Sequence, residues 1–219
     1  LGATVTVLAA SPDGTNINDG CGATDLGMLQ EVVRAGAVDL GIAFDGDGDR
    51  IMAVDETGAV VDGDRIIAAI ALHRRVERVA VTVMSNLGLH RLMAEHGIAV
   101  DTTDVGDRYV LEALRRAGGV LGGEQSGHVI WLDGHVTGDG LAAGLLLCAA
   151  LEGRPLSEVA GAMPVFPQAK ENVRVEGRAR VPEAVSAEVE RLNESLAGRG
   201  RILVRPSGTE PLIRVLVEA

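Results

Sequence analysis

Three aspartates alternate with glycines in the segment DGDGDR, residues 45–50. The segment directly follows an apolar stretch that is typical of a β-strand. Glycine lets a backbone bend sharply, so the carboxylates of Asp45, Asp47 and Asp49 can turn toward one centre and offer hard oxygen ligands. Carboxylates this close repel one another unless a cation lies between them. The pattern predicts a Mg²⁺ site, because a solvated turn is common for one Asp-Gly pair but not for three aspartates followed by Arg50.

Two other kinds of acidic loop share part of this pattern. A calcium-binding EF-hand loop also begins Asp-x-Asp-x-Asp, and Glu56 falls at its twelfth position, but Arg50 stands where that loop requires glycine. A haloacid-dehalogenase-type phosphatase uses the first aspartate of Asp-x-Asp as nucleophile. Its pattern continues with Thr or Val where this chain has Asp49. It also needs a later catalytic lysine, and Lys170 lies in a predicted linker, 166–172.

A second polar loop, GGEQSGH at residues 122–128, lies between two predicted strands. It presents the carboxylate of Glu124, the amide of Gln125, the hydroxyl of Ser126 and the imidazole of His128. Its glycines allow a ligand to approach the backbone closely. Such groups suit a small polyhydroxylated ligand. A tight hairpin whose polar side chains only satisfy the turn explains the loop equally well.

A third loop, RPSGTEP at residues 205–211, also joins two predicted strands. Guanidinium groups, hydroxyls and backbone N–H groups around a glycine form a nest suited to a phosphate dianion. The groups that would bind it are Arg205, Ser207, Gly208, Thr209 and, on the next strand, Arg214. A simple turn is the alternative, but arginines gathered in an otherwise acidic chain favour phosphate binding.

The elements that must position these loops alternate between strands and helices, which predicts an α/β fold. Strands are expected at 3–9, 39–45, 51–56, 78–84, 98–103, 119–123, 128–132, 172–175, 201–205 and 212–218, and helices at 26–34, 63–73, 88–95, 109–116, 141–151 and through Val185, Val189, Leu192 and Leu196. Three domains fit: the remnant of a mixed α/β domain at 1–57, a complete three-layer α/β domain at 58–163 and a small α+β domain at 164–219. Each carries one of the three loops.

Composition limits the possible partners. The hydrophobic content of 47% can supply cores, and the net charge of −11 argues against nucleic acid or anionic membrane as a partner. Cys21 and Cys148 lack the spacing of a zinc site or a disulfide framework, so a reduced, cytoplasmic protein is expected. The apolar stretch 141–151 is too short to cross a bilayer. The chain opens as if within a strand, with no signal peptide, so its start looks like a cut through a domain.

The motifs DGDGDR, GEQSGH and RPSGTEP, in this order, resemble the hallmark loops of the α-D-phosphohexomutase superfamily. Gln125 and the stretches NINDGCGATD and VGDRYVLE resemble its phosphoglucosamine mutase branch. The resemblance covers essentially the whole chain, as the end of the second family domain and all of the third and fourth. It implies interconversion of glucosamine 6-phosphate and glucosamine 1-phosphate, through a phosphoserine and a 1,6-bisphosphate, for cell-wall amino-sugar (UDP-N-acetylglucosamine) synthesis.

The resemblance also implies roles for individual residues. Asp45, Asp47 and Asp49 would hold Mg²⁺, and Arg50 would lie beside the phosphoserine. Glu124 and Ser126 would bind sugar hydroxyls, with His128 nearby as a proton-transfer aid, and Asp107 and Arg108 would line the cleft. The phosphate that does not react would be bound by Arg205, Ser207, Gly208 and Thr209. The implied catalytic set is Arg50, Arg108 and His128. Asp104 replaces a basic residue of several relatives, which leaves the general acid/base open.

One departure concerns the nucleophile, since no serine here lies in a Ser-His-Asn-Pro-like loop. The expected partners are a sugar phosphate, the missing amino-terminal domain of the same enzyme and a second copy of the protein in a homodimer. The chain alone is expected to be inactive. Two rivals stay open: a phosphomannomutase or phosphoglucomutase of the same fold, and a non-catalytic sugar-phosphate-binding module.

Overall fold

The computed structural model describes residues 2–36, 38–177, 179–207 and 210–219. This part of the chain contains seven helices and ten strands in three sheets, which confirms the predicted mixed α/β class. The chain divides into two compact units, unit 1 with Leu1–Ser85 and Leu89–Pro164, and unit 2 with Asn86–Gly88 and Val165–Ala219. The finer division at 1–57, 58–163 and 164–219 stays a prediction.

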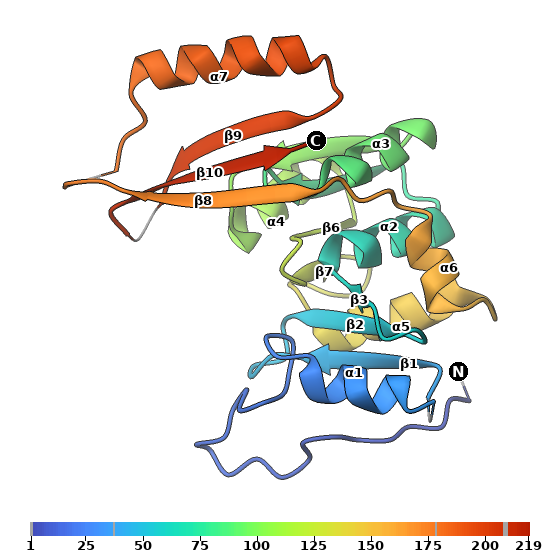
Figure 1. Cartoon of the computed structure of the whole chain (residues 1–219). Coiled ribbons are helices and arrows are strands. Elements are labelled where there is room, and N and C mark those ends of the chain that lie inside the picture. Colours follow the sequence, from blue (N-terminus) through green and yellow to red (C-terminus); the bar gives the residue numbers. More distant parts are fainter. Residues whose placement is uncertain (1, 37, 178, 208–209) are drawn as a thin grey trace. The chain divides into compact units, whose positions relative to one another are not determined.

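The first sheet of unit 1 is antiparallel and has the order β1-β2-β3. Its strands are β1 (Leu40–Phe44), β2 (Ile51–Asp55) and β3 (Val60–Val61). Helices α1 (Gly27–Arg34) and α5 (Gly140–Leu151) both pack against β1 and β2 (Figure 1). Phe44 lies opposite Ile51, so β1 and β2 form a hairpin whose connecting loop is 45–50.

The second sheet of unit 1 has the order β5-β4-β6-β7. Its strands are β4 (Arg78–Thr82), β5 (Ala99–Thr103), β6 (Leu121–Gly123) and β7 (Val129–Trp131). Strand β4 runs parallel to β5 and β6, while β7 is antiparallel to β6. The carboxyl ends of the three parallel strands therefore lie at one edge, where an α/β sheet usually binds its ligands.

Helices cover both faces of this sheet, because successive side chains of a strand point to opposite faces. Val79 and Val81 join the main core, whereas Ala80 packs in a smaller cluster with Val110 and Leu114 of α4. The remaining helices of unit 1 are α2 (Gly63–Arg74), α3 (Leu87–Glu95, whose first residues belong to unit 2), α4 (Asp107–Ala117) and α6 (Leu156–Gly161). The result is the three-layer arrangement that the sequence predicts.

Unit 2 is an antiparallel sheet of order β8-β10-β9 with one helix. Its elements are β8 (Gln168–Arg174), α7 (Glu183–Leu196), β9 (Arg201–Pro206) and β10 (Leu212–Glu218). Helix α7 lies along the sheet (Figure 1), and the Asn193 amide bonds both the backbone N–H and C=O of Ile202, at 2.7 and 2.9 Å. This arrangement leaves the β9–β10 hairpin loop at the end of the sheet.

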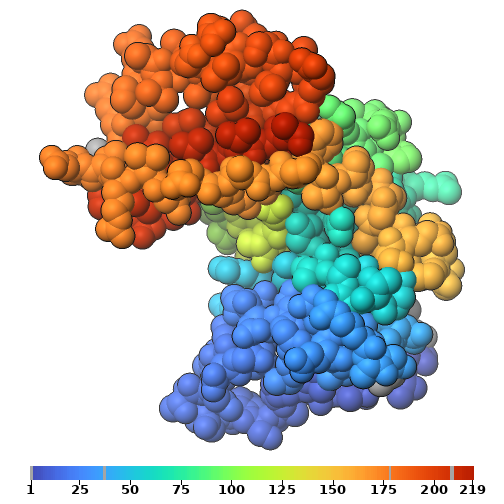
Figure 2. Space-filling model, viewed as in Figure 1, coloured from blue at the N-terminus to red at the C-terminus, as the bar shows by residue number. Residues whose placement is uncertain are grey.

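Two predicted elements are wrong. Residues 3–9 form no strand, since no described strand pairs with their backbone, and Val5 and Val7 are exposed. Figure 2 shows this stretch, in dark blue, at the surface of its unit. The predicted linker 166–172 contains the start of β8, an outer strand that needs few buried apolar side chains. Among the described residues, no helix is both long and apolar enough to span a membrane.

Candidate functional site

Each of the three predicted loops connects two adjacent antiparallel strands. The metal loop, residues 45–50, joins β1 to β2, and the sugar loop, residues 124–128, joins β6 to β7. The phosphate loop, residues 207–211, joins β9 to β10, and its Gly208 and Thr209 lie outside the described residues. A hairpin loop projects from the end of its sheet, so all three can present side chains to a ligand.

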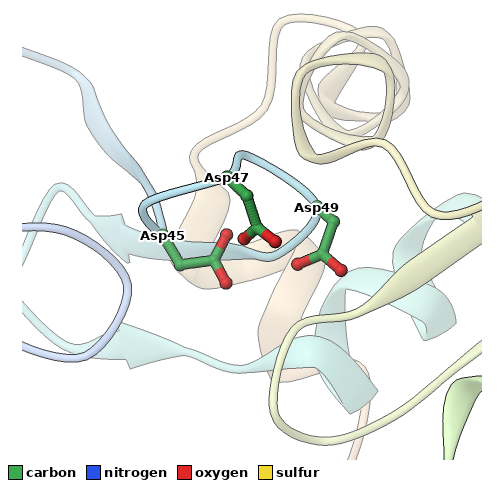
Figure 3. Close-up of side chains that lie close together, drawn as sticks. All are labelled: Asp45, Asp47 and Asp49. Carbon is green, nitrogen blue, oxygen red and sulfur yellow. The ribbon is translucent and has the colours of Figure 1, made fainter.

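The three aspartates of the metal loop converge. One carboxylate oxygen from each of Asp45, Asp47 and Asp49 lies within 4.8 Å of the others. Figure 3 shows the three side chains extending from the loop toward a common region. Donors of this kind suit Mg²⁺, which takes oxygen ligands at about 2.0–2.1 Å and keeps several of its waters. The donor set therefore fits the predicted ion.

Arg50 neutralises part of this charge from within the loop. Its backbone N–H donates to Asp45 Oδ1 at 3.1 Å, and its Nε lies 3.5 Å from Asp45 Oδ2 and 3.8 Å from Asp49 Oδ1. Three carboxylates and one guanidinium leave a charge of 1 − 3 = −2 on the loop. A divalent cation would balance this charge.

The environment of Asp49 disfavours the ionised form of its side chain. Partial burial raises the pKa of Asp49 above its ordinary value, and the negative charges of Asp45 and Asp47 add to that increase. His128 and Arg50 act in the opposite direction. A cation at this position would favour the ionised carboxylate.

The sugar loop is joined to the metal loop through the backbone. The Ile51 N–H donates to Gly127 C=O at 2.9 Å, and Arg50 forms a β-bridge with His128. Gly127 has φ +96°, and a Cβ atom there would lie 2.1 Å from Ile51 O, so only glycine fits. His128 Nδ1 lies 3.2 Å from Asp49 Oδ2. The structure thus brings together Arg50, His128 and Asp49, which the sequence placed in two separate motifs.

Other segments hold the sugar loop at the edge of the second sheet where the parallel strands end. Glu124 Oε1 accepts a hydrogen bond of 3.2 Å from Gly106 N–H in the VGDR turn that starts α4. The Gly63 N–H, at the start of α2, donates to Gln125 C=O at 3.1 Å. Ser126 lies exposed in the same loop. These contacts fix the loop while leaving its tip open to solvent.

The VGDR turn, residues 105–108, presents two charged side chains to solvent. Asp107 and Arg108 are both exposed in the first turn of α4. Arg108 Nε pairs with Glu112 Oε1 at 2.9 Å on the same helix, and this hydrogen bond raises the pKa of the guanidinium further. The described contact of Arg108 is therefore structural, and its catalytic role stays a prediction.

Three glycines that the sequence interpretation missed support these loops. A Cβ atom on Gly63 would lie 2.1 Å from Glu124 O, one on Gly138 would lie 2.2 Å from His128 Nε2, and one on Gly140 would lie 2.8 Å from Gly48 O. The Gly140 N–H also donates to Gly48 C=O at 2.9 Å. The available signal was an Asp-Gly pair before an apolar helix: the N-cap residues Asp62 and Asp139 precede Gly63 and Gly140.

The phosphate loop of unit 2 is flanked by two arginines. Arg205 of β9 lies directly opposite Arg214 of β10, a pairing of like charges that an anion would relieve. Arg214 Nη2 pairs with Glu210 Oε2 at 3.0 Å, and its buried Nε has no hydrogen-bond partner among the described residues. The Ser207 hydroxyl accepts from Glu210 N–H at 3.3 Å. Positive charge and free donor capacity therefore meet beside this loop.

Two family models match parts of the chain. Residues 62–166 match the family described as "Phosphoglucomutase/phosphomannomutase, alpha/beta/alpha domain III". Residues 171–219 match "Phosphoglucomutase/phosphomannomutase, C-terminal domain". The first match contains the sugar loop and the second contains the phosphate loop.

Individual proteins give the same result. Proteins named phosphoglucosamine mutase from Heliobacterium modesticaldum and Moorella thermoacetica are 54% and 55% identical to this chain, over all of it and over 50% and 51% of their own lengths. The chain thus spans about half the length of the curated relatives it matches. A solved Aspergillus fumigatus N-acetylphosphoglucosamine mutase, in complex with GlcNAc-6P and magnesium, matches 92% of this chain and 53% of its own, with TM-score 0.72 and 22% identity.

Proposed function

Because the chain belongs to the phosphoglucomutase/phosphomannomutase family, as its sequence predicts, we propose that it forms the metal-, sugar- and phosphate-binding part of a phosphosugar mutase. The proposed reaction interconverts glucosamine 6-phosphate and glucosamine 1-phosphate. The names of relatives that share 54% and 55% of their aligned residues with this chain support that substrate. The product would supply amino-sugar synthesis for the cell wall.

The observation that supports this proposal most is the convergence of Asp45, Asp47 and Asp49 beside the sugar loop. When bound there, Mg²⁺ would neutralise charge that develops on the transferred phosphoryl group. Arg50, which contacts the same carboxylates, would add a guanidinium on the side of the reacting phosphate.

The sugar and the second phosphate would be held by the other two loops. Glu124 keeps one carboxylate oxygen outside its bond to Gly106, so Glu124 and Ser126 could both hydrogen-bond sugar hydroxyls. Arg205 and Arg214 would bind the phosphate that does not react. Positioning and charge stabilisation can supply most of the catalysis of a phosphoryl transfer.

The proposed route also needs a group that stores phosphate. A phosphoserine outside these 219 residues would give its phosphoryl group to one sugar oxygen, forming the 1,6-bisphosphate, and would take back the phosphoryl group from the other oxygen. The half of each curated relative that this chain does not span is where we place that serine. The chain alone is accordingly proposed to lack mutase activity.

The decisive experiment is Asp47→Asn in the full-length protein, with turnover of glucosamine 6-phosphate followed against Mg²⁺ concentration. We expect turnover to fall about 100-fold or more, because several kcal/mol of transition-state charge stabilisation depend on the metal. Calorimetry should show weaker Mg²⁺ binding by the same variant.

Asp133→Asn is the matched control, since it removes an exposed carboxylate of unit 1 outside the three loops. It should behave as the wild type. Wild-type turnover by Asp47→Asn at low Mg²⁺ would refute the metal assignment. Glucose and mannose phosphates, assayed in parallel, test the choice of amino sugar.

A further inference from the structure

His128, beside the metal loop, is a polar residue that is almost completely buried, with 5% of its surface exposed. Its two ring nitrogens have different surroundings. Nδ1 lies 3.2 Å from Asp49 Oδ2. Nε2 is buried, has no hydrogen-bond partner among the described residues, and packs against Gly138.

The backbone determines where this ring lies. His128 forms a β-bridge with Arg50, and its C=O accepts a hydrogen bond of 3.0 Å from Glu124 N–H. The ring can occupy its place only because residue 138 is glycine, since a Cβ atom there would lie 2.2 Å from Nε2. The imidazole is thus confined between Gly138 and Asp49.

If the Asp49 carboxylate is ionised, a hydrogen bond between His128 Nδ1 and Asp49 Oδ2 has only one possible direction. An ionised carboxylate accepts hydrogen bonds and does not donate them, so His128 Nδ1 must carry the proton that joins the two groups. One rotamer of Asp49 is thereby favoured over the others. A bond that orients a metal-ligating side chain in this way commonly changes metal affinity.

A proton-transfer residue would need different surroundings. Such a residue must bring a ring nitrogen within about 2.6–3.2 Å of the substrate proton, directly or through one water. In this structure Asp49 occupies one nitrogen of His128 and Gly138 covers the other. The geometry therefore favours a role exercised through Asp49.

We propose that His128 is a positioning residue of the metal site: its Nδ1–H holds the Asp49 carboxylate in the orientation that binds the cation, and Gly138 leaves the space that this ring needs. The inference rests on the proposed function, because it requires a cation at Asp45, Asp47 and Asp49.

The test compares Mn²⁺ affinity, by calorimetry and by the electron paramagnetic resonance signal of bound Mn²⁺, among variants of the full-length protein. In His128→Asn the amide nitrogen can take the place of Nδ1, whereas in His128→Gln it reaches toward the Nε2 position. We expect His128→Gln to bind Mn²⁺ about 10- to 100-fold more weakly, the usual effect of losing a bond to a metal ligand. His128→Asn should stay within about threefold of the wild type, given the same donor.

Gly138→Ala tests the same idea without changing the histidine. Its Cβ atom should displace the ring from Asp49 and weaken Mn²⁺ binding in the same direction as His128→Gln. Gly161→Ala is the matched control, because nothing lies within 4 Å of the added carbon. Circular dichroism of each variant would show whether it is folded.

The outcomes separate this inference from the proposed function. Equal Mn²⁺ affinity of wild type and Asp47→Asn would refute the metal site itself. Clear dependence on Asp47, together with unchanged affinity and an unchanged Mn²⁺ spectrum in folded His128→Gln and Gly138→Ala, would overturn the role of His128 alone. Weaker binding in both variants, with affinity restored in His128→Asn, would support it.

Discussion

In unit 1 the metal and sugar loops rest on a core of fully buried apolar side chains, among them Ile51, Ile67 and Leu121, whereas in the described part of unit 2 Leu216 is the one buried apolar side chain. Backbone hydrogen bonds also join the two loops of unit 1, for example the bond that the Ile51 N–H donates to the Gly127 C=O. The loop of unit 2 instead lies between two arginines. Unit 1 is therefore suited to fixing groups precisely, and unit 2 to supplying charge.

A carboxylate at the start of a helix occurs in both units, in different surroundings. In unit 2, Glu218 has a fully buried side chain and accepts from the Leu87 N–H at the start of α3, from Gln168 Nε2 and from Arg201 Nε. In unit 1, Glu56 accepts from the N–H and the hydroxyl of Ser157, near the start of α6. The same contact should contribute more where burial leaves the donors no water to bind.

The largest effect should follow from Glu218→Gln. Neutralising this side chain removes the negative charge that faces Arg201 and gives the buried site an extra donor, so we expect the free energy of unfolding of unit 2 to fall by about 3 kcal/mol. Urea denaturation at pH 7 would measure the loss. Hydrogen exchange of the β8, β9 and β10 amides would locate it in unit 2.

Glu188→Gln, which removes a half-exposed carboxylate paired with Arg191 on α7, is the control for that measurement. A surface pair of this kind contributes little to stability, because water screens the two charges. If both variants lost the same small amount, the polar cluster around Glu218 would not be what stabilises unit 2, and the contrast between the units would fail.

Arg205→Ala tests whether unit 2 acts by supplying positive charge. A charge-assisted hydrogen bond contributes about 1.5–3 kcal/mol, so the dissociation constant for glucosamine 6-phosphate should rise about 10- to 100-fold in the full-length protein. Turnover at saturating substrate should change much less, because the phosphate held here is bound both before and after the chemistry. Calorimetry and steady-state kinetics would separate the two.

Arg180→Ala is the matched control, as it removes an exposed positive charge of the same unit. The comparison predicts that unit 1 variants such as Asp47→Asn act mainly on turnover and that Arg205→Ala acts mainly on affinity. If the Arg205→Ala enzyme bound glucosamine 6-phosphate normally but turned over slowly, this assignment of affinity to unit 2 would be wrong.

Local sequence pattern predicted most of the fold. The stretches that became β4, β6 and β10, and the long apolar helix α5, are each visible in the sequence as a local run of apolar residues. The prediction of a strand at 3–9 is wrong because a strand needs a neighbouring strand to pair with. The sequence pattern of a segment does not show whether such a neighbour is present. The two-residue strand β3 and the six-residue helix α6 are too short to carry a period.

The site was predictable loop by loop but not as an assembly. Three aspartates spaced two residues apart predict a metal site from one short segment, and in the structure their carboxylate oxygens lie close together. The contact between His128 and Asp49 depends on two hairpins that are distant in sequence, and no local pattern encodes it. The need for glycine at 63 and 138 is equally non-local, since the atoms that exclude a side chain belong to the sugar loop.

The smallest predicted effect concerns Glu56, the less buried of the two helix-capping carboxylates. Ser157→Ala removes the hydroxyl that donates to Glu56 but keeps the backbone N–H of residue 157, which donates to Oε2 at 3.2 Å. We expect the free energy of unfolding at pH 7 to fall by about 1 kcal/mol, the usual net contribution of one side-chain hydrogen bond. Denaturation of wild type and variant in urea would measure it.

The pH dependence of this difference distinguishes a bond to an ionised carboxylate from a simple loss of packing. The hydrogen bond from Ser157 lowers the pKa of Glu56 in the folded protein below its ordinary value. The folded state therefore binds fewer protons than the unfolded state in this range, so the stabilisation is complete above the unfolded pKa and is lost as the pH falls through the lowered one. The difference in the free energy of unfolding between wild type and Ser157→Ala should thus be constant from pH 7 to about 5 and shrink in more acidic solution.

Ser186→Ala, which changes an exposed serine of α7, is the control and should show no such trend. A gap that stayed the same at every acid pH would mean that Ser157 contributes packing and not a bond to charge, and Glu56 could then no longer be compared with Glu218 as a capping carboxylate.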